Sequence, residues 1–212
     1  MARAARLARE QLRALDRLSR FDALPPTYLA GGGAVAFHLT HRRSRDVDLF
    51  TLDPTASLDA FRDLARDPSA EVEITSGTDA ALHLRVAGAP VDVVRYPYPL
   101  LEAPVEGPVG WPVAGLMDLA TMKLVAIARR GIRRDFWDLY AIVQSGIALQ
   151  EAGLAYRRRF AKAESDLYHV WKSLTYFDDA ERDPVFPQGM SERRWRQVKR
   201  FFDERAAELV PL

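Results

Sequence analysis

Cysteine is absent from this sequence of 212 residues, so disulfide bonds and thiolate metal sites are excluded. No apolar run approaches the roughly 18–20 residues that a membrane-spanning helix needs. The basic N-terminus is not followed by an apolar segment, which excludes a secretory signal. The formal net charge is only +1, so the protein is not a histone-like polycation. We therefore expect a cytoplasmic globular protein without membrane contact.

Positive charge is nevertheless concentrated at a few places along the chain. Arginines cluster at residues 42–45, 129–134, 157–159 and 193–200. Local patches of this kind can hold phosphates even when the total charge is close to zero. Nucleotides and RNA are therefore compatible ligands.

The chain changes character at the proline-rich stretch 97–112. Residues before it combine short strands with short helices, and residues after it have the periodicity of consecutive helices. We expect three parts: an N-terminal helix (1–24), an α/β subdomain (25–112) and a helical subdomain (113–212). The fold class is α/β (α+β), with a small mixed sheet and flanking helices followed by helices alone.

Turn residues and apolar periodicity predict the individual elements. Strands are expected at 28–30, 46–50, 71–75, 81–86 and 91–94, with turns at 77 and 88–90. Helices are expected at 2–20, 34–41, 57–67, 115–129, 133–145, 149–162, 165–175 and 191–209. Residues 178–190 are expected to form an irregular loop.

The stretch at 28–50, YLAGGGAVAFHLTHRRSRDVDLF, joins a strand to a helix through three glycines. Gly31, Gly32 and Gly33 permit positive φ and a close approach of the backbone to a ligand. A helix that starts there presents free N–H groups to a phosphate. The alternative is a tight strand-to-helix turn with no ligand.

Asp46 and Asp48 follow in the same stretch, one residue apart. On a strand they point to one face, with Cα atoms roughly 7 Å apart. Two like charges on one face favour a bound cation, and hard oxygen ligands suit Mg²⁺ (or Mn²⁺). The alternative is a solvated edge strand whose acids are neutralised by Arg43 or Arg45.

Asp92 lies in an otherwise apolar strand, Pro90 to Val94. A buried carboxylate is costly unless it is paired or metal-bound. If this strand lies beside the strand at 46–50, Asp92 joins Asp46 and Asp48 as a metal ligand and general base for phosphoryl or nucleotidyl transfer. The alternative is an acid bonded to an arginine.

Two glycines, a short helix, Asp-x-Asp and a later acid on a strand resemble the nucleotidyltransferase fold of the polymerase-β-like superfamily. More narrowly, the chain resembles the AbiEii/AbiGii toxin family of nucleotidyltransferases. The matching stretches are residues 28–50, DLATMKLVAIARRGIRRDFWDLY at 118–140, and SLTYFDDAERDP at 173–184. The chain departs from the family pattern at Gly33, where many relatives have serine, and at Arg134, where lysine is expected.

The resemblance implies roles for further residues. Lys123 would contact the phosphates of the nucleotide, and Asp135 would be a further active-site acid. Asp46 and Asp48 would hold Mg²⁺, and Gly31 and Gly32 would cradle phosphate.

Two interpretations are open for the charged residues of the helical half. Lys123, in an otherwise apolar turn, either snorkels to solvent or reaches a charged cleft. In the functional interpretation, Lys123, Arg130 and Asp135 lie across a cleft from Asp46 and Asp48. In the structural interpretation, Asp135 and Asp138 only neutralise nearby arginines, and one such pair is Arg134 with Asp138.

These features predict an enzyme that transfers an NMP from an NTP to an RNA acceptor, at the 3′ end of tRNA. The family resemblance implies that the protein is the toxin of a toxin–antitoxin or phage-defence pair, with a cognate antitoxin protein as partner. Two alternatives stay open: transfer of AMP to a protein hydroxyl, and a non-catalytic module that binds a nucleotide or a partner.

Overall fold

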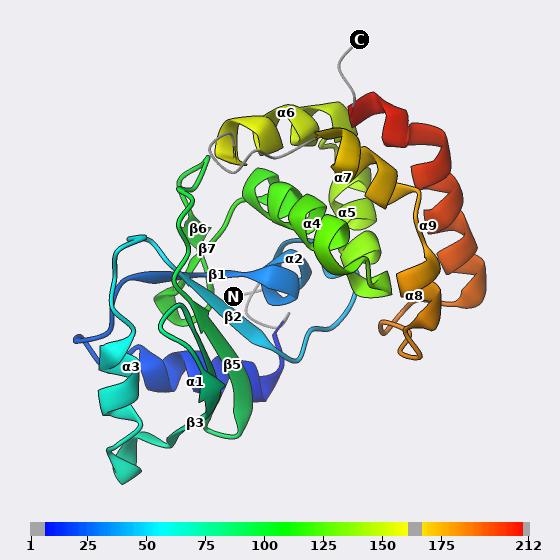
Figure 1. Cartoon of the computed structure of the whole chain (residues 1–212). Coiled ribbons are helices and arrows are strands. Elements are labelled where there is room, and N and C mark those ends of the chain that lie inside the picture. The colour runs from blue at the N-terminus through cyan, green and yellow to red at the C-terminus, as the bar shows by residue number, and fades with distance from the viewer. Residues whose placement is uncertain (1–6, 161–166, 210–212) are drawn as a thin grey trace. The chain divides into compact units, whose positions relative to one another are not determined.

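The computed structural model describes residues 7–160 and 167–209. The chain divides into two compact units, Met1–Gly115 and Leu116–Leu212. The first is rich in strands and the second is helical, which confirms the predicted mixed α/β class (Figure 1). No helix among the described residues has both the length and the apolar character that crossing a membrane requires.

The first unit is built on a mixed sheet with the strand order β3-β4-β5-β2-β1-β7-β6. Its elements in chain order are α1 (Arg9–Leu18), β1 (Thr27–Ala30), α2 (Gly31–Leu39), β2 (Val47–Thr51), α3 (Asp59–Leu64), η2 (Pro68–Ala70), β3 (Val72–Gly77), β4 (Ala81–Val86), β5 (Ala89–Val94), β6 (Val105–Glu106), η3 (Pro108–Gly110) and β7 (Pro112–Val113).

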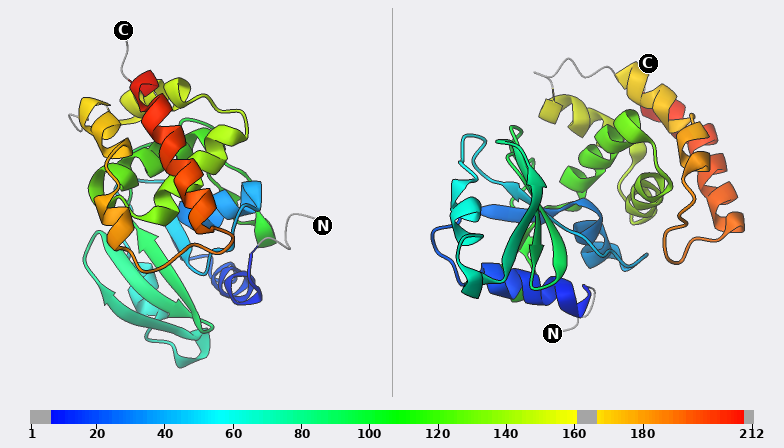
Figure 2. Two further views of the ribbon diagram at one scale, coloured as in Figure 1. Left: turned by 90° about the vertical axis from the view of Figure 1, so that its right-hand side faces the viewer. Right: turned by 60° about the horizontal axis from the view of Figure 1, so that its bottom comes forward.

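Helix α1 packs against the sheet through one apolar side. Its buried residues are Gln11, Ala14, Leu15 and Leu18, which the helical repeat places on one face. This face contacts β4 and β5, and Figures 1 and 2 show α1 (dark blue) beside these strands. Helix α1 therefore belongs to the core of the first unit.

The centre of the sheet is the parallel pair β2 and β5. Along β2, Val47 and Leu49 are buried while the residues between them are partly exposed. The same alternation along β5 buries Val91 and Val93. Because alternate residues point to opposite faces, the apolar residues fill the core and the aspartates between them share the other face.

The second unit consists of helices. They are α4 (Leu116–Arg130), α5 (Arg133–Gln144), α6 (Leu149–Phe160), α7 (Leu167–Leu174), α8 (Asp178–Arg182), α9 (Glu192–Arg205) and η5 (Ala206–Leu209). Phe136 of α5 joins α9 through ring contacts with Trp195 and Phe202, at centroid distances of 5.8 Å and 5.6 Å. This aromatic cluster forms part of the core.

Several predicted boundaries were wrong. Helix α2 begins at Gly31 and not at Ala34, and α8 occupies residues 178–182 of the expected loop. The proline-rich stretch holds the short strands β6 and β7. The predicted turn at 88–90 is correct only at Gly88, because the turn comprises Ala87 and Gly88 and β5 starts at Ala89. Parts of predicted helices at residues 2–6, 161–162 and 165–166 lie outside the described residues.

Candidate functional site

The carboxylate of Asp48 lies against the first residue of α2. A Cβ atom added to Gly31 would be 2.0 Å from Asp48 Oδ2, and Gly31 has a φ of +60°. The cause is the antiparallel pairing of β1 with β2, which sets Asp48 opposite Ala30, the residue before Gly31. The glycine therefore allows an acidic group to reach the N-terminus of the helix that follows β1.

Gly33 makes a second close contact with the same segment. A Cβ atom here would be 3.2 Å from the carbonyl oxygen of Asp46, which also accepts a 2.8 Å hydrogen bond from Gln11 Nε2. A serine side chain would thus project toward this carbonyl. The tight contact favours a residue without Cβ at this position.

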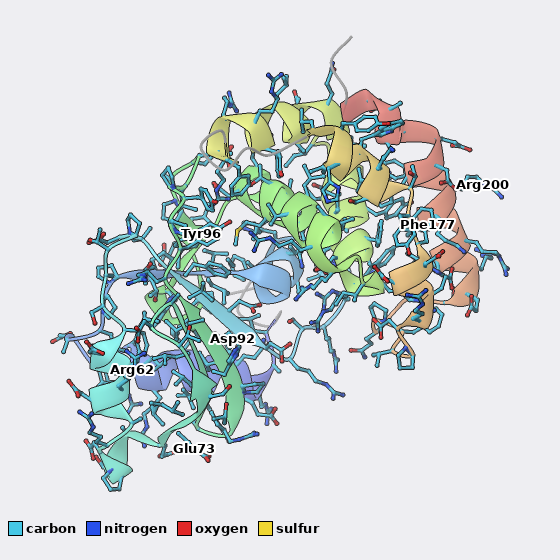
Figure 3. The ribbon with its side chains drawn as sticks, in the orientation of Figure 1. Arg62, Glu73, Asp92, Tyr96, Phe177 and Arg200 are labelled. Atoms are coloured by element: carbon cyan, nitrogen blue, oxygen red, sulfur yellow. The ribbon has the colours of Figure 1, made fainter. Side chains whose placement is uncertain are left out.

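Three polar residues form one row across neighbouring strands. Asp48 of β2 is in register with Asp92 of β5, and Asp92 is in register with His83 of β4. Figure 3 labels Asp92 on β5. The predicted adjacency of Asp48 and Asp92 is confirmed, and the edge-strand alternative is wrong because β2 pairs with β1 and β5. Within the part of the chain that the structure describes, Asp92 bonds to His83 and not to an arginine.

The paired aspartates suit a magnesium ion chemically. Mg²⁺ is commonly held by one or two carboxylates together with substrate phosphates and water, so Asp48 and Asp92 provide a sufficient protein donor set. Among the described residues, no group of three or more His, Cys, Asp or Glu side chains could hold a metal on its own. The assignment of all three aspartates to a metal therefore stays a prediction.

The other predicted residues meet in the second unit, around Asp135. Lys123 Nζ lies 3.0 Å from Asp135 Oδ1 and 2.7 Å from Asp138 Oδ2. Arg130 donates two hydrogen bonds to the same Asp135, from Nε to Oδ2 at 2.8 Å and from Nη2 to Oδ1 at 3.0 Å. Lys123 and Arg130 are two turns apart on α4, and the two aspartates are one turn apart on α5, so helical spacing creates the cluster.

Lys123 and the two aspartates of this cluster are buried. The Lys123 side chain is 6% exposed and both aspartates are fully buried, so the snorkelling interpretation of Lys123 is wrong. Burial alone would raise the pKa of Asp135, but the charge of Lys123 and the bonds from Arg130 outweigh it and lower the pKa. Asp135 is thus held ionised, and Arg130 is the more exposed cation.

Sequence reasoning missed two side chains of the first unit. Gln11 holds the Asp46 carbonyl, and His83 holds the Asp92 carboxylate. The alternation of Leu82 and Leu84 already placed His83 on the polar face of its strand. The residue opposite His83 depends on the register of β4 with β5, which the sequence analysis did not predict.

The fold is shared with a known class of enzymes. MenT4, a nucleotidyltransferase toxin from Mycobacterium tuberculosis H37Rv, has a similar structure with a TM-score of 0.57. The match covers 95% of this chain and 82% of MenT4 at 18% sequence identity, so the likeness concerns the fold.

The family follows from the sequence comparison. The model described as nucleotidyl transferase AbiEii toxin, type IV TA system, matches residues 13–208, and the chain belongs to this family. The predicted family resemblance is confirmed. The uncharacterized protein aq_aa25 of Aquifex aeolicus (strain VF5) is 33% identical over 209 residues, covering 97% of this chain and 98% of that protein.

Replacement of Gly31 by alanine tests the contact with Asp48. G31A and the control G88A both place alanine at positive φ, but only at Gly31 does the new methyl group meet a carboxylate. Nothing lies within 4 Å of the corresponding position at Gly88. We expect G31A to lower the free energy of unfolding by about 1–3 kcal/mol more than G88A, measured by urea denaturation. Equal losses would show that Asp48 moves aside without cost.

Removal of the buried ammonium group tests the second cluster. K123A removes the buried ammonium group that lies 3.0 Å from Asp135 Oδ1 and 2.7 Å from Asp138 Oδ2, so we expect a loss of about 3 kcal/mol or more in the free energy of unfolding. The control R129A removes an exposed cation from the same helix and should change stability by less than about 0.5 kcal/mol. Similar values for the two variants would contradict a buried, mutually dependent cluster.

Proposed function

We propose that the protein is an Mg²⁺-dependent nucleotidyltransferase that transfers an NMP from an NTP to RNA, at the 3′ end of tRNA. The acceptor hydroxyl oxygen bonds to the α-phosphorus, the bond from that phosphorus to the bridging oxygen breaks, and pyrophosphate leaves. In the cytoplasm, such a reaction would make the protein the toxin of a toxin–antitoxin pair.

One observation carries the proposal: Asp48 is in register with Asp92 and close to Gly31 at the start of α2. Acidic ligands and a helix N-terminus thereby meet at the end of one strand. A nucleotide triphosphate with a divalent cation needs both, since its phosphates attract backbone N–H groups and its cation attracts carboxylates.

Each residue then has a chemical role. Asp46, Asp48 and Asp92 would hold Mg²⁺ (or Mn²⁺), which supplies charge neutralisation for the triphosphate when bound. The N–H groups at Gly31, Gly32 and Gly33 would hold phosphate oxygens.

Asp92 would also accept the proton of the attacking hydroxyl. From the second unit, Lys123 and Arg130 would contribute positive charge to the nucleotide. Asp135 would position both cations, because it bonds to each of them.

The charge on α9 supports RNA as the acceptor. Arg193, Arg196 and Arg200 are exposed and recur on one helical face, opposite the buried Trp195, Val198 and Phe202. None of these three arginines has an ion pair within residues 7–160 and 167–209. Figure 3 shows Arg200 extending outward from α9. Unpaired guanidinium groups in a row suit the phosphates of a nucleic acid.

Helix stability does not explain this row. Like charges three or four residues apart repel each other, and Arg193 lies in the first turn, where the helix dipole disfavours positive charge. An anionic partner that binds along the row would offset the repulsion among the three arginines.

Labelled nucleotides test the proposed reaction. Incubation of the wild-type protein with labelled NTPs, Mg²⁺ and total tRNA should label RNA. D48N should reduce labelling by at least about a hundredfold, since it removes a charge on which transition-state stabilisation depends. The exposed D79N, in the same unit, should label as the wild type does. Expression of the wild type should arrest growth, and D48N should relieve the arrest.

The same reaction separates the competing functions. Label on protein instead of RNA would favour AMPylation. NTP binding in a calorimeter with no pyrophosphate release under any acceptor would favour a non-catalytic module. Undiminished labelling by D48N would contradict the assigned site.

Salt dependence tests the arginine row on α9. We expect R193Q/R196Q/R200Q to weaken tRNA binding and to reduce the slope of log Kd against log salt by about two, since each phosphate contact contributes roughly 0.7–0.9. NTP affinity should not change.

A charge-matched control is R20Q/R66Q/R182Q. It removes three exposed arginines that are paired with Asp16, Asp63 and Asp179. An equal effect of both triple variants on tRNA binding, measured by fluorescence anisotropy, would show that only total charge matters.

A further inference from the structure

The residue opposite Asp92 on the outer strand is a histidine with a direct bond to it. His83 Nδ1 lies 2.7 Å from Asp92 Oδ1. His83 continues the row that begins with Asp48 and Asp92, because the three residues are in register on β4, β2 and β5. The bond thus engages one carboxylate oxygen and leaves Oδ2 out of the hydrogen bond.

The chemistry of the two groups determines the direction of the bond. An ionised carboxylate can only accept a hydrogen bond, so the hydrogen is on Nδ1 of His83. This holds for the imidazolium ion and for the neutral tautomer with Nδ1 protonated. His83 is therefore a donor that fixes the rotation of the Asp92 side chain.

A bulge in the neighbouring strand lies at the same level. The register of β3 with β4 shifts between Ile74 and Ser76, and Ser76 faces His83. The extra residue, Thr75, donates its hydroxyl hydrogen bond to the His83 carbonyl at 3.0 Å. Bulges change the local twist and often aim a side chain beside a functional site.

Stability is a weak reason for this pair. The side chains of His83 and Asp92 are 54% and 39% exposed, and exposed pairs contribute little to folding. Carboxylates that bind metals, by contrast, are commonly held by a second hydrogen-bonding group that sets their orientation.

We propose that His83 is a positioning residue for Asp92. The Nδ1–H group of His83 holds Oδ1 of Asp92, so that Oδ2 of Asp92 faces the divalent cation and the nucleotide. The inference rests on the proposed function and adds to it a residue outside the aspartate set. Loss of the donor would let the Asp92 carboxylate rotate, which lowers its affinity for the cation.

The test is Mn²⁺ affinity in the presence of a non-hydrolysable NTP analogue, measured by the electron paramagnetic resonance signal of free Mn²⁺. We expect H83A to weaken Mn²⁺ binding about tenfold, as loss of an outer hydrogen-bonding partner does. H83N should restore most of the affinity, because the asparagine amide nitrogen is as far along the side chain as Nδ1. The control R85A, two residues along β4, should bind Mn²⁺ as the wild type does.

A double-mutant cycle with Asp92 makes the test specific. D92N alone should weaken Mn²⁺ binding, and H83A added to D92N should have no further effect, because His83 acts through Asp92. Thermal unfolding of each variant verifies that it is folded. In the labelling reaction, kcat of H83A should fall and kcat of H83N should stay near the wild-type value.

Three results would count against the inference, and they are distinguishable. If H83N binds Mn²⁺ as poorly as H83A, the ring itself is needed and positioning by the N–H group is wrong. If D92N weakens binding but H83A does not, the inference fails and the proposed function stands. If D92N leaves both Mn²⁺ binding and labelling unchanged, the metal site of the proposed function fails, and the inference with it.

Discussion

The close approach of the Asp48 carboxylate to Gly31 is the constraint on which the first unit depends. The antiparallel register of β1 and β2 places Asp48 beside the start of α2, and only a residue without Cβ leaves room for its carboxylate there. The parallel pairing of β2 with β5 adds Asp92 at the same level. A strand end, a helix N-terminus and two acids are thus brought together by one sheet.

The second unit depends on a buried cluster of opposite charges. Lys123, Asp135 and Asp138 are buried together, and Arg130 closes the cluster from its exposed side. Burying these charges separately would cost several kcal/mol each, so they are stable only as a set. The bonds that stabilise the helix pair also hold Lys123 and Arg130 in fixed positions.

Local sequence patterns predicted most helices and strands, because strand alternation and helix periodicity depend only on residues that are close in the sequence. The strand at 81–86 was predicted with the bounds it has, and the helix at 133–145 to within one residue. The turn between β4 and β5 was predicted too far along the chain. It consists of Ala87 and Gly88, both at positive φ, an arrangement that alanine seldom adopts. The predicted turn at 88–90 includes Ala89 and Pro90, which are the first residues of β5. The contact between His83 and Asp92 was not predicted, because it depends on the pairing of the two strands.

The sequence by itself determined the family, the fold class and the acidic and basic residues available for chemistry. It did so because glycine runs, Asp-x-Asp spacing and helical spacing are local features of the chain. Only the tertiary structure decided which of these groups meet. The register of Asp48 with Asp92 joins strands more than forty residues apart in sequence, and its physical basis is backbone hydrogen bonding between them, which no short stretch specifies. Burial of Lys123 likewise follows from the packing of α4 against α5.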